Sequence, residues 1–163
     1  MRRMDYRITG LAADTFRPLF GLSDEALARR GAKRYVAHIK PGFPDRVELR
    51  DAEPGETLIL VNHVHLDEAT PYRASHAVFV LENAGERFDR VNELPPALRV
   101  RLLSLRAFDA AHMMVDADVV HGREAEPVIE RLLSNPRTAY VHAHYAKPGC
   151  YAARIERVPA DTA

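Results

Sequence analysis

The last third of the chain carries the clearest alternation of apolar and polar side chains. Residues 113–120 alternate with a period of two, which predicts a strand with one buried face. Residues 124–133 repeat apolar side chains at helical spacing, which predicts an amphipathic helix. Residues 138–145 and 151–158 are rich in aromatic and β-branched side chains and predict two final strands, joined by a tight turn.

Shorter helices are expected earlier in the chain. Ser23 precedes two acidic residues and an apolar run, so it is expected to cap a helix that ends at Gly31. Pro95 and Pro96 are tolerated only in a first turn, so they predict a helix that continues to about Leu103.

The remaining segments predict strands and their connections. Short apolar runs predict strands over 34–39, 58–61 and 77–81, with a weaker candidate over 46–49. Polar segments predict a loop over 63–71 and an exposed connection over 83–92. With no repeat and no long linker, the prediction is a single globular domain over 1–163 with an α+β fold. It is a mainly antiparallel, mixed β-sheet with short helices and one strand-helix-strand crossover near the C-terminus.

The crossover also predicts which side chains share a face. A helix over 124–133 needs an apolar surface to cover, and the strands on either side of it offer one each. Those surfaces are formed by Val115, Ala117 and Val119 in one strand and by Val141, Ala143 and Tyr145 in the other. Asp116, Asp118, His142 and His144 are then expected together on the opposite face, within pairing distance if the two strands are neighbours. A slip of one residue would reverse this arrangement.

Charge and composition exclude some classes of partner. The 163 residues hold 23 Lys and Arg against 23 Asp and Glu, so the formal net charge is zero. A nucleic-acid partner recognised through a bulk positive field is therefore not expected. A net charge near zero leaves a homo-oligomer open.

Cysteine usage and hydropathy favour a cytoplasmic protein. Cys150 is the only cysteine, so no disulfide within the chain is expected. No apolar run reaches the length of a membrane span, so no membrane partner is expected. The charged residues 1–6 are not followed by the apolar stretch of a secretory signal.

Two histidines on one strand face make a divalent transition metal the first candidate cofactor. His142 and His144 lie two residues apart and project from the same face of the strand. His76 is the preferred third ligand, with His65, Asp116 or Asp118 as other sources. The alternative is a structural face in which the histidines are hydrogen-bonded to Asp116 or Asp118.

The same residues could support catalysis without a metal. His142 or His144 could act as general base, oriented by Asp116. Cys150 beside a histidine also contains the parts of a thiolate mechanism. The alternative for Cys150 is a small buried thiol with a packing role.

A second cluster of donors predicts recognition of a small anionic ligand. Arg73, Ser75 and His76 precede a buried strand, and Arg106 could add to them. A guanidinium can hold a carboxylate or phosphate through two hydrogen bonds. The alternative is that Arg73 ties its own loop to a nearby acid such as Asp67.

Several motifs together resemble a bacterial family that is classed only as a domain of unknown function. They lie at residues 70–77, 106–109, 114–119 and 148–154, and residues 6–11 and 51–56 fit the same family. The resemblance implies a bacterial, cytoplasmic, single-domain protein and brings no activity, substrate or cofactor.

Two hypotheses of function follow. The first is a small-molecule enzyme or ligand-binding protein with a polar His/Asp/Arg site that depends on a metal or acts without one. The second is a non-catalytic protein-interaction domain whose His/Asp face is a structural hydrogen-bond network.

Overall fold

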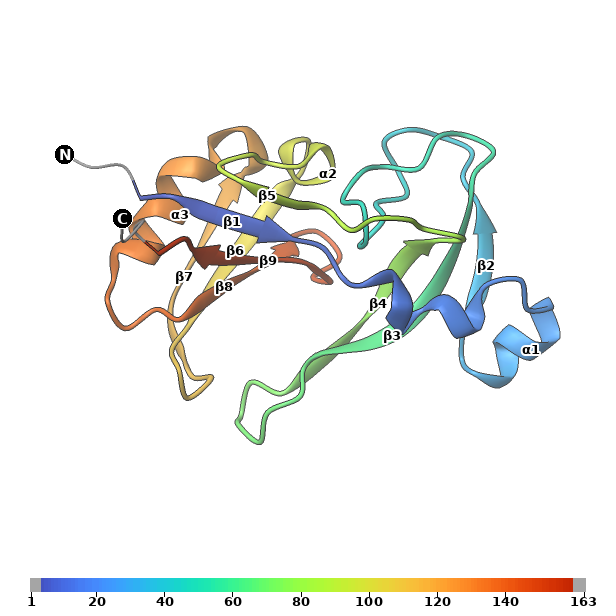
Figure 1. Ribbon diagram of the computed structural model, residues 1–163, viewed down its shortest axis with the longest axis horizontal. Coiled ribbons are helices and arrows are strands. Elements are labelled where there is room, and N and C mark those ends of the chain that lie inside the picture. The colour runs from blue at the N-terminus through green and yellow to red at the C-terminus, as the bar shows by residue number, and fades with distance from the viewer. Residues whose placement is uncertain (1–3, 160–163) are drawn as a thin grey trace.

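The computed structural model describes residues 4–159, and its strands form two sheets that stand side by side (Figure 1). The larger sheet has six strands in the order β5-β1-β9-β8-β6-β7. Its strands are β5 (Asp89–Val91), β1 (Tyr6–Thr9), β9 (Tyr151–Arg157), β8 (Tyr140–Tyr145), β6 (Leu102–Phe108) and β7 (Met114–His121). The smaller sheet contains β2 (Lys33–Val36), β3 (Thr57–Leu66) and β4 (Ala74–Leu81). All pairings between these strands are antiparallel.

Helices are short, which confirms the α+β class. The α-helices are α1 (Asp24–Arg29), α2 (Pro96–Arg99) and α3 (Ala125–Ser134), and 3-10 turns cover Ala13–Thr15, Arg17–Leu19 and Gly122–Glu124. The Ser23 side chain accepts a hydrogen bond from the Ala26 amide at 3.1 Å, as expected of an N-cap. Gly31 adopts a φ of +69° just after α1, a backbone conformation that other residues rarely tolerate.

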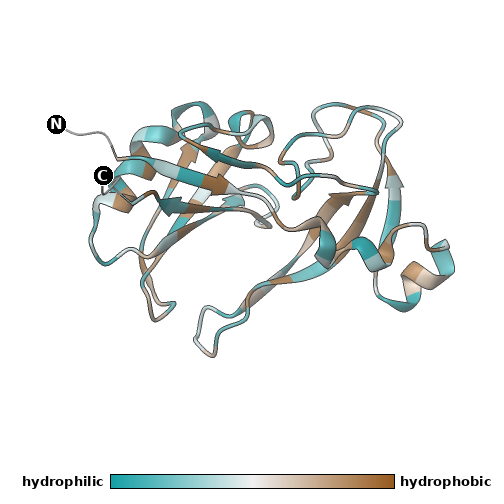
Figure 2. Ribbon diagram, viewed as in Figure 1, coloured by the Kyte–Doolittle hydropathy of each residue, from teal (hydrophilic) through white to brown (hydrophobic). Residues whose placement is uncertain are grey.

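The larger sheet and α3 enclose the main core. Ile129, Leu132 and Leu133 of α3 are buried against Leu105 and Val141 of the sheet. Each such side chain contributes about 1.5–3 kcal/mol when it leaves water, so this contact fixes the helix on one face of the sheet. A second core lies within the smaller sheet, whose strands β3 and β4 are more hydrophobic than the outer strand β2 (Figure 2).

The crossover near the C-terminus is present, but its two strands are not neighbours. β7 and β8 are both antiparallel to β6 and lie on either side of it, so they run parallel to each other with β6 between them. Residues 102 and 103 were expected at the end of a helix and no strand was expected over 104–108, yet residues 102–108 form the strand that separates β7 from β8.

Other boundaries also differ from expectation. Residues 63–66 continue β3 where a polar loop was expected, and residues 89–91 form the exposed strand β5 within the expected connection. Residues 46–49 form no strand in the described structure, and the isolated bridges nearby involve Pro44 and Asp45. Backbone hydrogen bonds to partners far along the chain override the polarity of a segment, and a single sequence does not reveal those partners.

No helix among residues 4–159 is long and apolar enough to cross a membrane. The charged amino terminus noted above begins with residues 1–3, which lie outside the described residues.

Candidate metal centre

Four histidines from the two sheets gather where the sheets face each other. His142 and His144 come from β8, His65 from β3 and His76 from β4. The ring centroid of His65 lies 4.8 Å from that of His76, 5.1 Å from that of His144 and 5.7 Å from that of His142. Tyr151 of β9 stacks on His65 with a centroid separation of 4.9 Å. The cluster is therefore a product of the packing of the two sheets.

A β-bulge directs His65 into this cluster. The register of β3 against β4 shifts between Val64 and Leu66, which leaves His65 without a partner residue across the ladder. Such a bulge turns a side chain away from the regular alternation and is common beside functional sites. A second bulge lies in β9, where Ala143 pairs with Ala153 but His144 pairs with Tyr151. This bulge brings Tyr151 opposite His144.

Three of the imidazoles have the spacing of metal ligands. The ligand nitrogens of His65, His76 and His144 lie within 4.8 Å of one another. The Nδ1 atoms of His65 and His76 are 3.4 Å apart. Two nitrogens bound tetrahedrally to zinc are separated by about 3.4 Å, so this pair already has the required spacing. A shift of about 1.4 Å by the third imidazole, from 4.8 Å to about 3.4 Å, would complete a three-nitrogen site.

The backbone sets the tautomer of His144. Its Nδ1 atom lies 3.1 Å from the carbonyl oxygen of Gly149. A carbonyl only accepts hydrogen bonds, so Nδ1 carries the proton and the lone pair resides on Nε2. A metal-binding histidine is commonly oriented by this kind of contact through its second nitrogen.

Burial keeps these imidazoles neutral, which is the form that binds metal. Desolvation, followed by the neighbouring positive charges, lowers the pKa of His65 to about 4 and that of His144 to about 3. The pKa of His76 is lowered by desolvation and by Arg106 and Arg46. The site therefore has little proton competition at neutral pH.

Arg106 supplies positive charge beside the cluster. Its Nε donates to Ser104 Oγ at 3.2 Å, and no carboxylate of residues 4–159 bonds to its guanidinium. Desolvation lowers the pKa of Arg106, and its charge in turn lowers the pKa of His65 and His144. A half-buried guanidinium with free donors is suited to an anionic ligand, as the sequence predicted for this residue.

His142 lies at the edge of the cluster, among aromatic rings. It is 2 % exposed, and its Nδ1 has no hydrogen-bond partner in the described structure. The rings of Tyr140 and Tyr151 each lie 5.0 Å from its own. Desolvation lowers the pKa of His142 to about 2. The sequence predicted His142 as a metal ligand, but the nitrogens that lie close together are those of His65, His76 and His144.

The expectation that Asp116 and Asp118 share the histidine face is wrong. Arg106 lies opposite both His142 and Ala117, so the alanine and not the acids shares that face. Both carboxylates bond instead to Arg131 of α3, at 3.0 and 2.8 Å. The physical reason is that the intervening strand β6 fixes the register of β7 independently of β8. Asp116 therefore lies on the opposite face of the sheet and does not orient His142 or His144.

The structure brings only part of the predicted anion cluster together. His76 and Arg106 face the histidine site, whereas Ser75 is exposed on the alternate face of β4. Arg73 is exposed and its guanidinium pairs with Asp67 in the β3–β4 hairpin, which is the structural alternative considered above.

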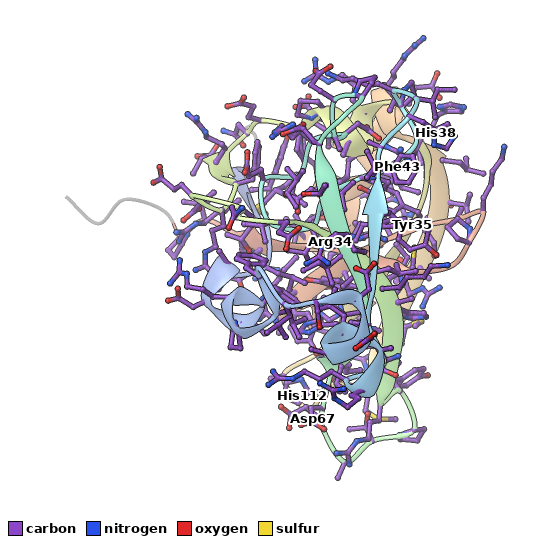
Figure 3. All side chains as sticks on the ribbon, turned by 90° about the vertical axis from the view of Figure 1, so that its right-hand side faces the viewer. Arg34, Tyr35, His38, Phe43, Asp67 and His112 are labelled. Atoms are coloured by element: carbon purple, nitrogen blue, oxygen red, sulfur yellow. The ribbon has the colours of Figure 1, made fainter. Side chains whose placement is uncertain are left out.

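That hairpin instead contacts the turn between β6 and β7. Figure 3 shows Asp67 and His112 near each other at the lower end of the molecule. Thr70 Oγ1 donates to the His112 carbonyl oxygen at 3.4 Å, and Glu68 lies 3.9 Å from the His112 ring. These contacts join the two sheets at the rim of the site.

Cys150 lies outside the histidine cluster but close to it along the chain. It is partly buried, and its Sγ accepts a hydrogen bond from Arg46 Nη2 at 2.9 Å. Arg46 is 1 % exposed and also donates to the carbonyl oxygens of Tyr151 and Pro44. The thiol is thus paired with a buried cation and not with a histidine.

His65 was expected only as one of several possible third ligands, and Tyr151 and Arg46 were not expected at the site. One signal for His65 was present: His63 and His65 repeat the His-x-His spacing of His142 and His144. The polarity of the segment favoured a loop, which concealed this second pair. Nothing local marks Arg46 as a buried residue.

Comparison with models of protein families gives a match over most of the chain. A family model described as "Protein of unknown function (DUF1203)" matches residues 42–157, which include all four clustered histidines. No curated protein and no solved structure matches the chain.

Proposed function

Because the chain belongs to the DUF1203 family of proteins of unknown function, we propose its function from the site itself: it binds a divalent transition metal and uses it on a small anionic molecule. The observation that supports this most is the convergence of His65, His76 and His144, from three strands of two sheets, with nitrogens within 4.8 Å. We further propose that it works in the cytoplasm, where a lone cysteine remains reduced.

The donor set favours zinc or another borderline metal. Neutral imidazoles suit zinc, copper, iron and nickel, whereas calcium and magnesium prefer oxygen ligands. Three protein ligands leave one tetrahedral position for water or substrate, which is the pattern of catalytic sites and not of closed structural ones. A metal held by these three histidines would act as a Lewis acid and would lower the pKa of a water molecule bound at the open position.

Arg106 gives the site a preference for anions. Its charge reaches all of the proposed ligands, as the lowered pKa values of His65, His76 and His144 indicate. A carboxylate or phosphate group next to the metal would be held by this guanidinium and would also neutralise it. Because Arg106 is partly buried, that interaction would be stronger than one at an exposed site.

The second candidate is an interaction domain whose histidines form a structural network. It is supported by the 3.4 Å contact between the Nδ1 atoms of His65 and His76, in which one neutral ring could donate to the other. In that case the four rings serve only to hold the two sheets together.

Metal titration separates the two candidates. Protein treated with a chelator and then dialysed is titrated with Zn²⁺ by calorimetry and with Co²⁺ by absorption spectroscopy. We expect about one equivalent to bind, with the intense visible absorption of tetrahedral cobalt. His144→Ala and His65→Ala should each weaken binding by more than about 100-fold, since loss of a supporting contact alone costs 10–100-fold.

His121→Ala is the matched control, because His121 is exposed at the end of β7 and belongs to no histidine cluster in the described structure. It should bind metal as the wild type does. Folded wild-type protein that binds neither ion, or equal affinity in the His144→Ala and His121→Ala variants, would exclude the metal site and favour the interaction domain.

A further inference from the structure

A cavity of about 790 Å³ is lined by His76, but His65, His142 and His144 are not among its described lining residues. Its apolar walls come from both sheets and include Leu60, Phe79 and Leu102. It also extends to the β8–β9 turn, where Cys150 and Lys147 line it. The volume is within the range of sites that enclose small organic molecules.

The polar groups of this cavity are almost all cationic or neutral donors. Arg46, Arg101 and Lys147 line it, and none of its described lining residues is an Asp or a Glu. Arg101 is paired with Asp51 at 2.6 Å, whereas Arg46 bonds only to two carbonyl oxygens and the Cys150 sulfur among residues 4–159. The walls therefore carry an excess of positive charge in a partly open cavity, where charge acts more strongly than in bulk water.

One side chain that lines the cavity carries a donor without a partner among residues 4–159. Tyr145 is 2 % exposed and its hydroxyl has no hydrogen-bond partner in the described structure. The guanidinium carbons of Arg46 and Arg101 lie 4.9 and 5.1 Å from the centre of its ring. Burial raises the pKa of Tyr145 to about 12, so this hydroxyl keeps its proton and can donate it to an acceptor. A buried polar group without a partner is uncommon in native structures, and this one belongs to a side chain that lines the cavity.

We infer that this cavity binds a small organic anion, a carboxylate with an apolar body, whose charged end lies toward Arg46, Arg101 and Cys150. The apolar body would contact the Leu60 and Phe79 walls. Because the cavity adjoins His76, identifying this anion as the substrate rests on the proposed metal function, but the binding itself does not require a metal.

Cys150 provides a direct probe, because it is the only cysteine and lines the cavity. Iodoacetate and iodoacetamide react with it in the same way: the sulfur–carbon bond forms, the carbon–iodine bond breaks, iodide leaves and the thiol proton passes to solvent. The two reagents differ in charge, so the ratio of their rate constants reports how strongly the cavity attracts an anion.

The ratio is measured in metal-free protein and compared with that of N-acetylcysteine. We expect iodoacetate to be favoured in the protein by about tenfold or more relative to N-acetylcysteine, since a cationic cleft raises the local concentration of anions by 10-fold to 10³-fold. Lys147→Gln should lower the ratio, while Lys33→Gln, which removes an exposed lysine from β2, should not. Hexanoate should protect Cys150 from iodoacetamide at concentrations at which hexanol does not.

A ratio equal to that of N-acetylcysteine in folded protein would overturn the inference, and so would equal protection by hexanoate and hexanol. Equal ratios in the two lysine variants would also contradict it. Metal titration of the same preparation keeps the two proposals distinct. Bound metal with an ordinary ratio removes only the anion cavity, and a high ratio without metal removes only the metal site.

Discussion

Replacing His142 with phenylalanine should make the protein less sensitive to acid. The folded protein holds this imidazole with its pKa lowered from 6.5 to about 2, mainly because it is desolvated. The unfolded chain takes up a proton at His142 as the pH falls below 6.5, whereas the folded protein does not. Stability is therefore fully present above pH 6.5 and is lost progressively as the pH falls toward 2.

The size of the effect follows from the distance between the working pH and the ordinary pKa. At pH 5, which lies 1.5 units below 6.5, neutral His142 costs the folded state about 2 kcal/mol relative to the unfolded chain. At pH 7 the same cost is only about 0.2 kcal/mol. The His142→Phe variant should thus gain about 2 kcal/mol on the wild type between pH 7 and pH 5.

Packing changes do not enter this difference. Phenylalanine is larger than histidine, and a crowded site among Tyr140, Tyr151 and Phe108 could cost about 1–3 kcal/mol at either pH. That cost is the same at pH 7 and pH 5, so it cancels when the two pH values are compared. The Nδ1 atom has no hydrogen-bond partner among the described residues, so its removal leaves no described group unpaired.

Urea unfolding at pH 7 and pH 5, followed by circular dichroism in the presence of a chelator, measures these free energies. His142→Gln is the matched variant: it removes the titrating group but keeps a polar side chain. Both variants should show the same flattened pH dependence, with the glutamine variant less stable at pH 7. A wild-type pH dependence in His142→Phe would refute the assignment of a buried neutral imidazole at this position.

Three further outcomes test the arrangement of the site and its frame. Asp116→Asn should leave metal affinity unchanged and lower the free energy of unfolding by at most about 1 kcal/mol, because the 3.0 Å ion pair of Asp116 with Arg131 is half exposed. A loss of metal binding in this variant would show that Asp116 belongs to the site. Gly122→Ala should destabilise the folded protein by about 3 kcal/mol or more, since the added Cβ would lie 1.9 Å from the Leu98 carbonyl oxygen. Gly85→Ala is the control, because a Cβ there meets open space and should have little effect on thermal or urea unfolding. Zinc affinity should change little between pH 7.5 and 5.5, because desolvation lowers the pKa of His65 to about 4; a tenfold loss per pH unit in competition titrations would contradict neutral ligands.

Much of the fold could be predicted from the sequence because it depends on local chemistry. Ser23 caps α1 through its own hydroxyl, and the apolar stripe of residues 124–133 predicts where α3 (Ala125–Ser134) lies and which side it buries. The strands over 140–145 and 151–157 match the aromatic and β-branched runs that indicated them. In each case the decisive interaction lies within a few residues of the chain.

The sequence-based predictions were wrong where a strand far along the chain determined the local structure. Residues 63–66 are polar, yet they form strand because β4 supplies backbone hydrogen bonds along their length. The strand over 102–108 entered the sheet between β7 and β8, so the register of Asp116 was set against β6 and not against His142. Alternation gives the two faces of a strand, but it does not say which face meets which neighbour.

The sequence by itself determined the histidine pair on β8, the family, the α+β class and the helix that covers the main core. Only the tertiary structure decided that His65 and His76 from another sheet complete the cluster, that the acids face away, and that Arg46 is buried beside Cys150. The physical reason is that a metal or anion site joins side chains that are far apart in the chain. Their approach depends on a β-bulge and on the packing of two sheets, neither of which is specified by any short segment alone.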